Sequence, residues 1–287
     1  MKTIPIRHIN AAQKLPDLSG RFSIRDVREL LGGKDLIQEL HRHNFFFILA
    51  LQNGKGSHEI DFKTYKAFNN SVFFMRPGQV HQLILKTGCS GYLMEFDAEF
   101  YHANNNRSSQ RLRKASNKNF CKLDTNGFKK LNSILAYIFR EYIEKQEGHL
   151  EVIKSNLDIL FIELIRQSRN PKNLAKDTNQ YTQARLEEFL ELLEIHVTNL
   201  KQASQYANLL NLSLYQLNGI TKATVGKTCS ELINEYIILE AKRYLLATPN
   251  QVKDIADRLG YEDVSYFTRF FKKHTGYAPE AFRNNFR

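Results

Sequence analysis

The chain has 287 residues, of which 42% are hydrophobic and 25% charged, and its formal net charge is +11. These values exclude a disordered or collagen-like chain, and the length suits two domains. The longest unbroken apolar run, Phe45 to Leu51, is too short to span a bilayer, and no apolar signal segment follows Met1. Three widely spaced cysteines, Cys89, Cys121 and Cys229, cannot form a disulfide framework or a zinc ribbon, so we expect reduced thiols in a cytoplasmic protein.

The positive charge is concentrated in the first part of the chain. Residues 1–179 contain 28 Lys and Arg against 18 Asp and Glu, whereas residues 180–287 contain 13 against 12. Residues 107–130 contain eight basic residues and a single acidic residue, Asp124. The total charge suggests a polyanionic partner. For residues 107–130 we nevertheless favour a solvated basic face over a second DNA site.

Residues 22–97 are rich in β-forming residues that alternate with polar ones, and turn residues separate the stretches. The expected strands are Phe22–Val27, Glu39–Leu51, His58–Phe68, Val72–Met75, His81–Lys86 and Tyr92–Phe96. Short strands at this spacing predict a barrel or a sandwich. Residues 1–20 are expected to form an irregular arm.

Beyond Phe100 the apolar residues recur at helical spacing. Asp124 and its neighbours offer N-caps for a helix that ends near Gln146, and a second helix follows Gly148. The two apolar stripes are Leu131, Ile134, Leu135, Ile138, Phe139 and Tyr142, then Val152, Ile153, Leu157, Leu160, Phe161, Leu164 and Ile165. These stripes predict a helical hairpin that packs on the strands or on a second subunit.

A polar segment without periodicity, residues 170–180, is the best linker candidate. From Tyr181 onward the pattern is entirely helical. The predicted organisation is an arm and β-barrel over 1–106, a basic segment and dimerisation hairpin over 107–169, the linker, and an all-α domain over 181–287.

The last domain contains an internal near-repeat. Leu217, Lys222 and Gly226 match Phe267, Lys272 and Gly276 at an offset of 50 residues, and residues 207–212 match 256–261 at an offset of 49. Each copy is a helix, a short turn and a helix. Asn211 and Gly260 stand where the first helix must stop, at positions that favour a left-handed backbone. This pattern predicts two helix-turn-helix motifs.

A long helix from about Cys229 to Leu246 separates the two motifs, and Thr228 with Glu231 forms its capping box. At 1.5 Å per residue, roughly 18 residues span about 27 Å. That length is comparable to the ~34 Å between major-groove faces one turn apart on duplex DNA. Two recognition helices on such a spacer are suited to successive major grooves.

The segments Glu240–Leu246 and Val252–Pro279 resemble the signature of AraC-type transcription regulators, over about 85 residues. The resemblance implies promoter DNA as the partner and base-reading side chains on the exposed face of each recognition helix. Arg269 is the strongest candidate because a guanidinium pairs bidentately with guanine. Lys272 and Lys273 are expected on phosphates. The implied DNA-binding residues are Tyr215, Asn218, Lys222, Val264, Ser265, Thr268, Arg269, Lys272 and Lys273.

The first motif departs from the family pattern. Gly219 replaces what is often arginine, and Thr221 replaces the usual phenylalanine. Asn218 remains able to read adenine, whereas Gly219 removes a contact and costs about 1 kcal/mol of helix propensity. Base reading by the first recognition helix is therefore open.

His41-Arg42-His43 and the segment Pro77 to His81 resemble the cupin-like sensor barrel of many AraC-type regulators. On a single strand, His41, His43, Phe45 and Phe47 would point the same way. The resemblance implies a small-molecule effector inside the barrel. Its candidate lining is His41, His43, Phe45, Phe62, Phe73, Met75, His81 and Tyr92.

Three histidines also raise a metal hypothesis. Metal-binding cupins usually add a glutamate shortly after the His-x-His pair, and here Asn44 to Ile48 contain no carboxylate. We therefore expect no metal, no cofactor and no catalytic residue. The alternatives are a metal-dependent cupin enzyme fused to a DNA-binding module, and an effector-independent DNA binder.

The sequence thus predicts a two-domain protein with a cupin-like β-barrel and a helical hairpin, followed by an all-α domain with two helix-turn-helix motifs. The expected function is sequence-specific transcription regulation by an effector that shifts the population of conformations. We expect a cytoplasmic homodimer with no membrane contact, and RNA polymerase as a further partner if the protein activates transcription.

Overall fold

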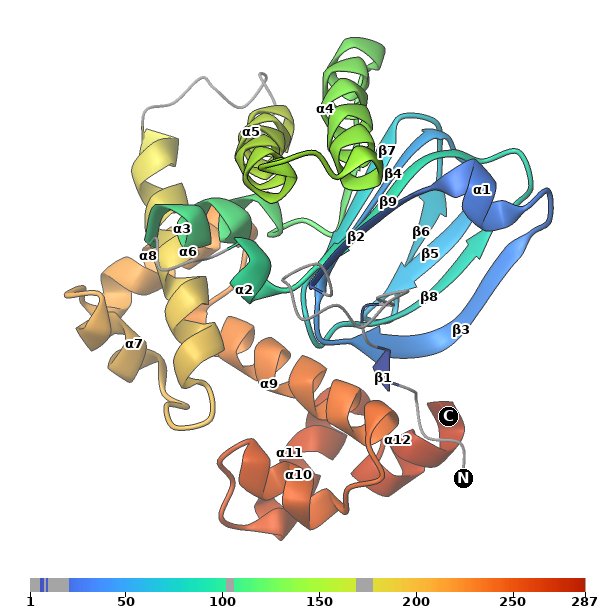
Figure 1. Ribbon diagram of the computed structural model, residues 1–287. Helices are drawn as coiled ribbons and strands as arrows, with labels where there is room; N and C mark the ends of the chain where they lie inside the picture. The colour runs from blue at the N-terminus through green and yellow to red at the C-terminus, as the bar shows by residue number, and fades with distance from the viewer. Residues whose placement is uncertain (1–5, 8, 10–20, 102–105, 169–177, 287) are drawn as a thin grey trace. The chain divides into compact units, whose positions relative to one another are not determined.

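The computed structural model describes residues 6–7, 9, 21–101, 106–168 and 178–286. The chain divides into two compact units, Ile4–Asn170 and a second that contains Pro171–Arg287, and each is described by itself (Figure 1). Most of the predicted linker lies outside the described residues. Its last three residues already belong to helix α6, which begins at Thr178.

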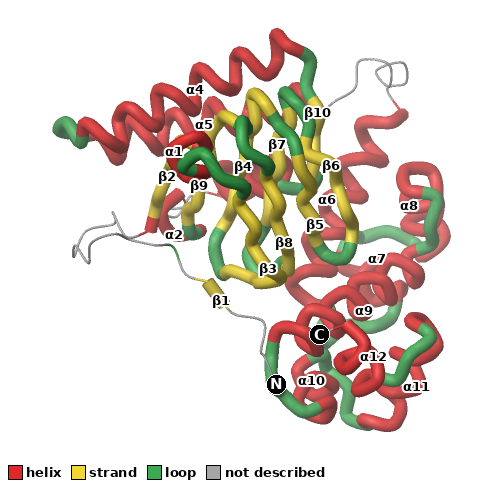
Figure 2. The backbone as a smooth tube through the Cα atoms, turned by 90° about the vertical axis from the view of Figure 1, so that its right-hand side faces the viewer, coloured by secondary structure: helices red, strands yellow, loops and turns green. Residues whose placement is uncertain are grey.

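Two five-stranded sheets form the β-rich part of the first unit (Figure 2). In order across the sheet, the first contains β1 (Ile6–Arg7), β3 (Leu36–His43), β8 (Val80–Leu85), β5 (Gly56–Ile60) and β6 (Lys63–Ala67). The second contains β10 (Phe120–Lys122), β7 (Ser71–Met75), β4 (Phe46–Asn53), β9 (Ser90–Phe96) and β2 (Phe22–Asp26). Neighbouring strands are antiparallel except β1 and β3.

Two of the predicted strands are each divided in the structure. The stretch Glu39–Leu51 breaks at Asn44 and Phe45, and its halves β3 and β4 belong to different sheets. The stretch His58–Phe68 is the hairpin of β5 and β6, whose turn places Asp61 at φ 48° and Phe62 at φ 67°. A two-residue hairpin turn with positive φ at both positions usually contains Asn or Gly, so Phe62 gives no turn signal.

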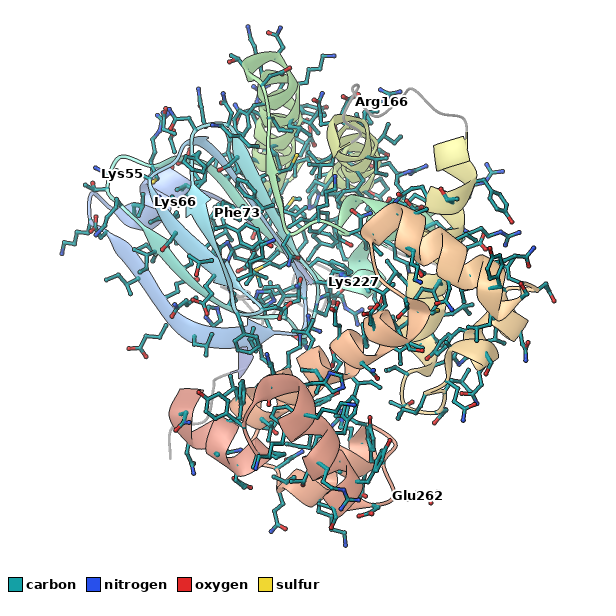
Figure 3. The ribbon with its side chains drawn as sticks, turned by 180° about the vertical axis from the view of Figure 1, so that it is seen from behind. Lys55, Lys66, Phe73, Arg166, Lys227 and Glu262 are labelled. Atoms are coloured by element: carbon teal, nitrogen blue, oxygen red, sulfur yellow. The ribbon has the colours of Figure 1, made fainter. Side chains whose placement is uncertain are left out.

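Two apolar layers flank the second sheet. One lies between the sheets and includes Leu49, Phe73, Leu83 and Leu93, all fully buried; Figure 3 shows the position of Phe73 on β7. The other joins the opposite face of the second sheet to the helices that follow the strands. Short helices α1 (Val27–Leu31), α2 (Ala98–Tyr101) and α3 (Asn106–Ala115) complete the unit.

The predicted helical hairpin is confirmed as α4 (Thr125–Glu144) and α5 (His149–Ser168). Asp124 caps α4, because its Oδ1 accepts a hydrogen bond from Gly127 N at 2.6 Å. Leu131, Leu135 and Ile138 of α4 are buried with Phe161 of α5 in the outer layer. The hairpin therefore buries much of its apolar surface on the second sheet.

The second unit contains seven described helices: α6 (Thr178–His196), α7 (Ala203–Leu209), α8 (Leu214–Val225), α9 (Cys229–Ala247), α10 (Val252–Arg258), α11 (Val264–Thr275) and α12 (Pro279–Phe286). The expected left-handed residues are confirmed, with Asn211 at φ 53° and Gly260 at φ 74°. The capping box of Thr228 and Glu231 at the start of α9 is also confirmed. Two helix-turn-helix motifs, α7–α8 and α10–α11, thus flank one long helix.

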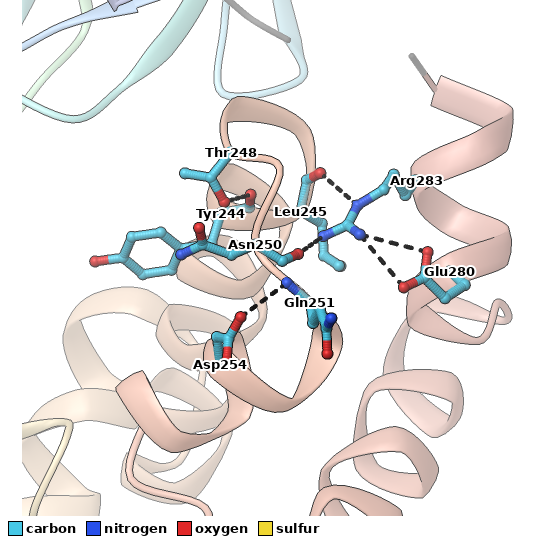
Figure 4. A network of polar contacts seen from close by, with 8 residues as sticks. All are labelled: Tyr244, Leu245, Thr248, Asn250, Gln251, Asp254, Glu280 and Arg283. Atoms are coloured by element: carbon cyan, nitrogen blue, oxygen red, sulfur yellow. Dashed lines mark hydrogen bonds and ion pairs between the residues drawn. The ribbon is translucent and has the colours of Figure 1, made fainter. Parts of the chain in front are cut away.

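A buried arginine fixes the last helix to the second motif. Arg283 of α12 donates from Nε to Leu245 O at 3.0 Å and from Nη2 to Asn250 O at 2.5 Å, and its Nη1 lies 3.3 Å from Glu280 (Figure 4). The two carbonyls lie at the end of α9 and just before α10. This guanidinium therefore joins α12 to the α9–α10 connection. Among the described helices, none combines the length and apolar character needed to cross a bilayer.

Candidate DNA-binding interface and histidine cluster

Helix α11 presents the basic side chains of the second motif. Phe267 and Phe271 are fully buried and fix the orientation of the helix. The opposite face exposes Arg269, whose side chain is 70% exposed and whose Nη2 lies 4.0 Å from Asp263 Oδ2. Asp263 also caps the helix by accepting from Ser265 N at 2.7 Å. An exposed guanidinium beside the first helical turn is suitably placed for a base edge in a major groove.

The predicted DNA-binding residues of α11 lie on this side of the helix, and they fall into an exposed group and a half-buried group. Ser265, Arg269, Lys272 and Lys273 are exposed. Val264 and Thr268 are half-buried beside them.

Helix α8 of the first motif is different in character. Tyr215 is 88% exposed and Lys222 is also exposed, as the prediction requires. Asn218 is half-buried, and its Oδ1 accepts a hydrogen bond from Cys229 N at 2.9 Å. The prediction that Asn218 reads adenine stays a prediction, and a bidentate contact would have to use the second lone pair of an oxygen that already caps α9.

Lys201 joins the connection between α6 and α7 to the turn of the second motif. Its ammonium donates to Val197 O at 2.6 Å, Thr198 O at 3.0 Å and Leu259 O at 2.5 Å. The first two carbonyls end α6, and the third ends α10. Burial lowers the pKa of Lys201 to about 8, so the ammonium persists at pH 7 and its three donors match three acceptors. This contact ties the turn of the second motif to the segment that precedes α7.

Replacing Lys201 with methionine keeps the side-chain length and removes the charge. We expect the free energy of unfolding to fall by about 1–2 kcal/mol, because three carbonyls lose a charged donor. DNA affinity should fall as well, because the turn before the second recognition helix loses a contact that holds it to the α6–α7 connection. Far-UV circular dichroism in urea and DNA binding of the full chain measure the two effects. Lys253→Met on α10, an exposed lysine, is the control, and equal effects of the two substitutions would contradict this role for Lys201.

In the first unit, four imidazoles gather between the two sheets. His41 and His43 lie on β3, His81 on β8 and His58 on β5, and none is more than 2% exposed. His58 Nε2 lies 2.8 Å from His81 Nδ1. The ring centroids of His41 and His43 lie 4.1 and 4.9 Å from that of His81.

Backbone carbonyls orient two of these rings. Nδ1 of His41 lies 2.8 Å from Glu39 O, and Nδ1 of His43 lies 3.0 Å from Phe45 O. A carbonyl only accepts, so each Nδ1 carries the hydrogen and each Nε2 is an acceptor in the neutral ring. Polar acceptors thus lie inside an otherwise apolar interior.

Most of the predicted effector-binding residues come together here. Phe45, Phe73 and Met75 belong to the layer between the sheets, and the His43 ring lies 4.2 Å from that of Phe45. Phe45 reaches the layer from the turn between β3 and β4, so the four residues predicted to share one strand converge from β3, this turn and β4.

Two of the predicted effector-binding residues lie elsewhere, and one buried histidine was missed. Phe62 is a half-buried turn residue. Tyr92 faces the helices, 5.4 Å from the Phe139 ring, because its neighbour Leu93 is the residue of β9 that faces between the sheets. His58 gave no paired motif, and only its alternation with Ile60 on β5 signals an inward orientation.

Burial strongly perturbs the imidazole of His58. Complete burial lowers its pKa to about 3, and the neighbouring His43 and His41 contribute to the lowering. Within the described residues, its Nδ1 has no hydrogen-bond partner. No group of three or more His, Cys, Asp or Glu among the described residues is arranged to hold a metal ion.

These two sites define a class of protein: a β-domain with a polar interior joined to a double helix-turn-helix module. Two family models match the chain: an AraC-like ligand binding domain over residues 35–148 and a helix-turn-helix domain over residues 206–285. The chain belongs to the AraC family of DNA-binding transcription regulators.

Three individual proteins to which the chain is similar share less than a third of its residues over the aligned region. The HTH-type transcriptional activator RhaS of Escherichia coli O81 is 23% identical over 248 residues, which cover 85% of this chain and 86% of that protein. Among solved structures, ToxT of Vibrio cholerae with a bound unsaturated fatty acid is 16% identical, with 92% and 95% coverage and a TM-score of 0.42. The C-terminal domain of the response regulator yesN of Fusobacterium nucleatum is 27% identical, with 35% and 98% coverage and a TM-score of 0.33.

Proposed function

We propose that this regulator binds specific promoter sequences and that a small molecule bound between the two sheets of the first unit controls this binding. The observation that carries sequence specificity is the exposed Arg269 on α11, beside a capped first turn. Lys222, Lys272 and Lys273 are proposed phosphate contacts, because their exposed ammonium groups lie on the two recognition helices. In this proposal the protein acts in the cytoplasm as a regulator and not as an enzyme.

Arg269→Ala tests the proposal for DNA. A duplex selected from a random library with the full-length protein should bind the variant about 1–3 kcal/mol more weakly, with relaxed specificity at one base pair. Titration of labelled duplex at a stated salt concentration measures this loss. Arg185→Ala on α6, where Arg185 pairs with Glu188, is the control and should leave affinity unchanged. Equal affinity of the Arg269 variant and the unaltered protein would remove Arg269 from base reading.

Four imidazoles and aromatic rings in one interior support the effector proposal. Backbone carbonyls fix the rings of His41 and His43 through Nδ1, and Phe45, Phe73 and Met75 supply apolar contact. The ligand-binding family model covers this part of the chain. The mechanism is a population shift: the effector binds one conformation better and so changes how the DNA-binding unit is presented. The relatives named as activators support RNA polymerase as a partner.

We also propose a homodimer formed through α4 and α5. These helices leave Tyr137, Ile143 and Ile159 at 43%, 61% and 49% exposure although their inner stripes are buried. Burying such side chains in an interface is favourable. Sedimentation of the full chain should give a dimer at micromolar concentration, and Ile159→Glu should weaken it at least tenfold. Ile37→Glu, at a 66% exposed position on β3, is the control. A monomer for the unaltered chain at that concentration would overturn this assignment.

A further inference from the structure

The first recognition helix carries an apolar reading surface in place of a polar one. Tyr215 and Leu214 stand in its first turn at 88% and 42% exposure. Tyr215 is the most exposed large hydrophobic side chain among the described residues. Its position matters because the N-terminal residues of a recognition helix are the ones that contact base edges.

The two amide side chains of this helix each already use their oxygen within the protein. Asn218 uses its amide oxygen to cap α9, and Gln216 uses its own to accept from Ser213 N at 2.8 Å. Gly219 has no side chain, and a Cβ added there would meet no atom within 4 Å. Lys222 is the single charged residue of the helix.

The corresponding helix of the second motif also exposes a tyrosine in its first turn, Tyr266 at 56%, but it differs at two other positions. By the repeat, Tyr215 corresponds to Ser265 and Gly219 to Arg269, and the last turn of α11 adds Lys272, Lys273 and His274. A guanidinium recognises guanine, whereas the C5-methyl group of thymine is the apolar feature that a major groove offers. The two motifs therefore differ in the kind of base edge that they fit.

We propose that Tyr215, with Leu214, contacts thymine methyl groups in the major groove, so that the first motif selects A·T pairs by apolar contact. This inference rests on the proposed sequence-specific DNA binding. The binding site then has two unlike parts, a guanine-containing part read by Arg269 and a thymine-containing part read by Tyr215. The Gly219 gap leaves room for the groove wall next to the tyrosine ring.

The test removes single methyl groups from the DNA. In the site selected with the full-length protein, each thymine of the part not read by Arg269 is replaced by uracil, which pairs identically and lacks the methyl. We expect one or two replacements to weaken binding about fourfold, the factor for losing one buried methyl-sized group. Tyr215→Ala should weaken binding to the thymine site and abolish the preference for thymine over uracil. Tyr215→Phe should keep it.

Tyr181→Ala, another exposed tyrosine on α6, is the matched control and should keep the uracil effect. If the selection from a random library recovers no motif, both the proposed function and this inference are contradicted. A motif that depends on Arg269 but tolerates uracil everywhere would overturn this inference alone. So would a uracil effect that persists in Tyr215→Ala, because the methyl contact would then belong to another residue.

Discussion

Replacing Gly260 with alanine should lower the free energy of unfolding of the DNA-binding unit by about 2–5 kcal/mol. Gly260 ends α10 at φ 74°, a left-handed conformation that costs an L-residue about 1–2 kcal/mol. An added Cβ would also collide with the backbone carbonyl of Thr198 and approach Lys201 Nζ. A backbone atom cannot turn aside, so overpacking adds about 1–3 kcal/mol. Urea titration followed by far-UV circular dichroism measures the change in the full chain.

Two other glycines of the same unit are matched controls. Gly276 has a similar φ of 81°, and a Cβ added there would meet open space, so Gly276→Ala should cost only the conformational part, about 1–2 kcal/mol. Gly219 lies inside α8, also in open space, and Gly219→Ala should stabilise by up to about 1 kcal/mol. If Gly260→Ala and Gly276→Ala lower the free energy of unfolding equally, then the expected collision of the added Cβ with Thr198 has no energetic cost.

The second unit was predictable because its signals are local. Capping residues such as Thr228 and left-handed positions such as Asn211 and Gly260 specify where helices begin and end, and the structure follows them. A helix needs only neighbours in sequence for its hydrogen bonds, so its pattern can be interpreted without knowing the partner elements. The same holds for α4, where Asp124 caps the predicted start.

The β-rich part was predicted less accurately. Which residues of a strand face which side, and where the turns lie, depends on partners that are distant in sequence. A shift of one residue exchanges the two faces of a strand. Both faces of β9 are covered, one by the first sheet and one by helices, so apolar residues occupy both, and Tyr92 could not be distinguished from Leu93. The hairpin turn at Phe62 holds an aromatic residue at positive φ, which no local rule anticipates.

For the candidate sites too, residues with local sequence signals were predictable and residues that depend on distant partners were not. The exposed position of Arg269 was predictable from the resemblance of its helix to the recognition helix of the family, and the structure exposes it, whereas its contact with a base stays a prediction. The capping role of Asn218 was not anticipated, because its partner, Cys229 N, lies eleven residues later in the chain. His58 was missed because it joins His81 only through the pairing of β5 with β8.

Acid should destabilise the first unit through His58. Its pKa is about 3 in the folded protein, against 6.5 for an ordinary histidine. Between these values the unfolded chain binds a proton that the folded chain does not, so the free energy of unfolding falls as the pH falls. Each pH unit in this range is worth about 1.4 kcal/mol. The stability present above pH 6.5 should therefore drop by about 2 kcal/mol at pH 5 and about 3 kcal/mol at pH 4.

His58→Gln isolates this contribution, because glutamine does not titrate and its Nε2 reaches toward His81 as the imidazole does. The variant should be less stable than the unaltered protein at pH 8, and the difference between them should shrink by about 2 kcal/mol at pH 5. Urea unfolding of the full chain at a series of pH values measures both curves. His274→Gln, an exposed histidine on α11, should leave the slope nearly unchanged. If His58→Gln loses stability in acid as steeply as the unaltered chain, the buried imidazole of His58 is not the acid-sensitive group.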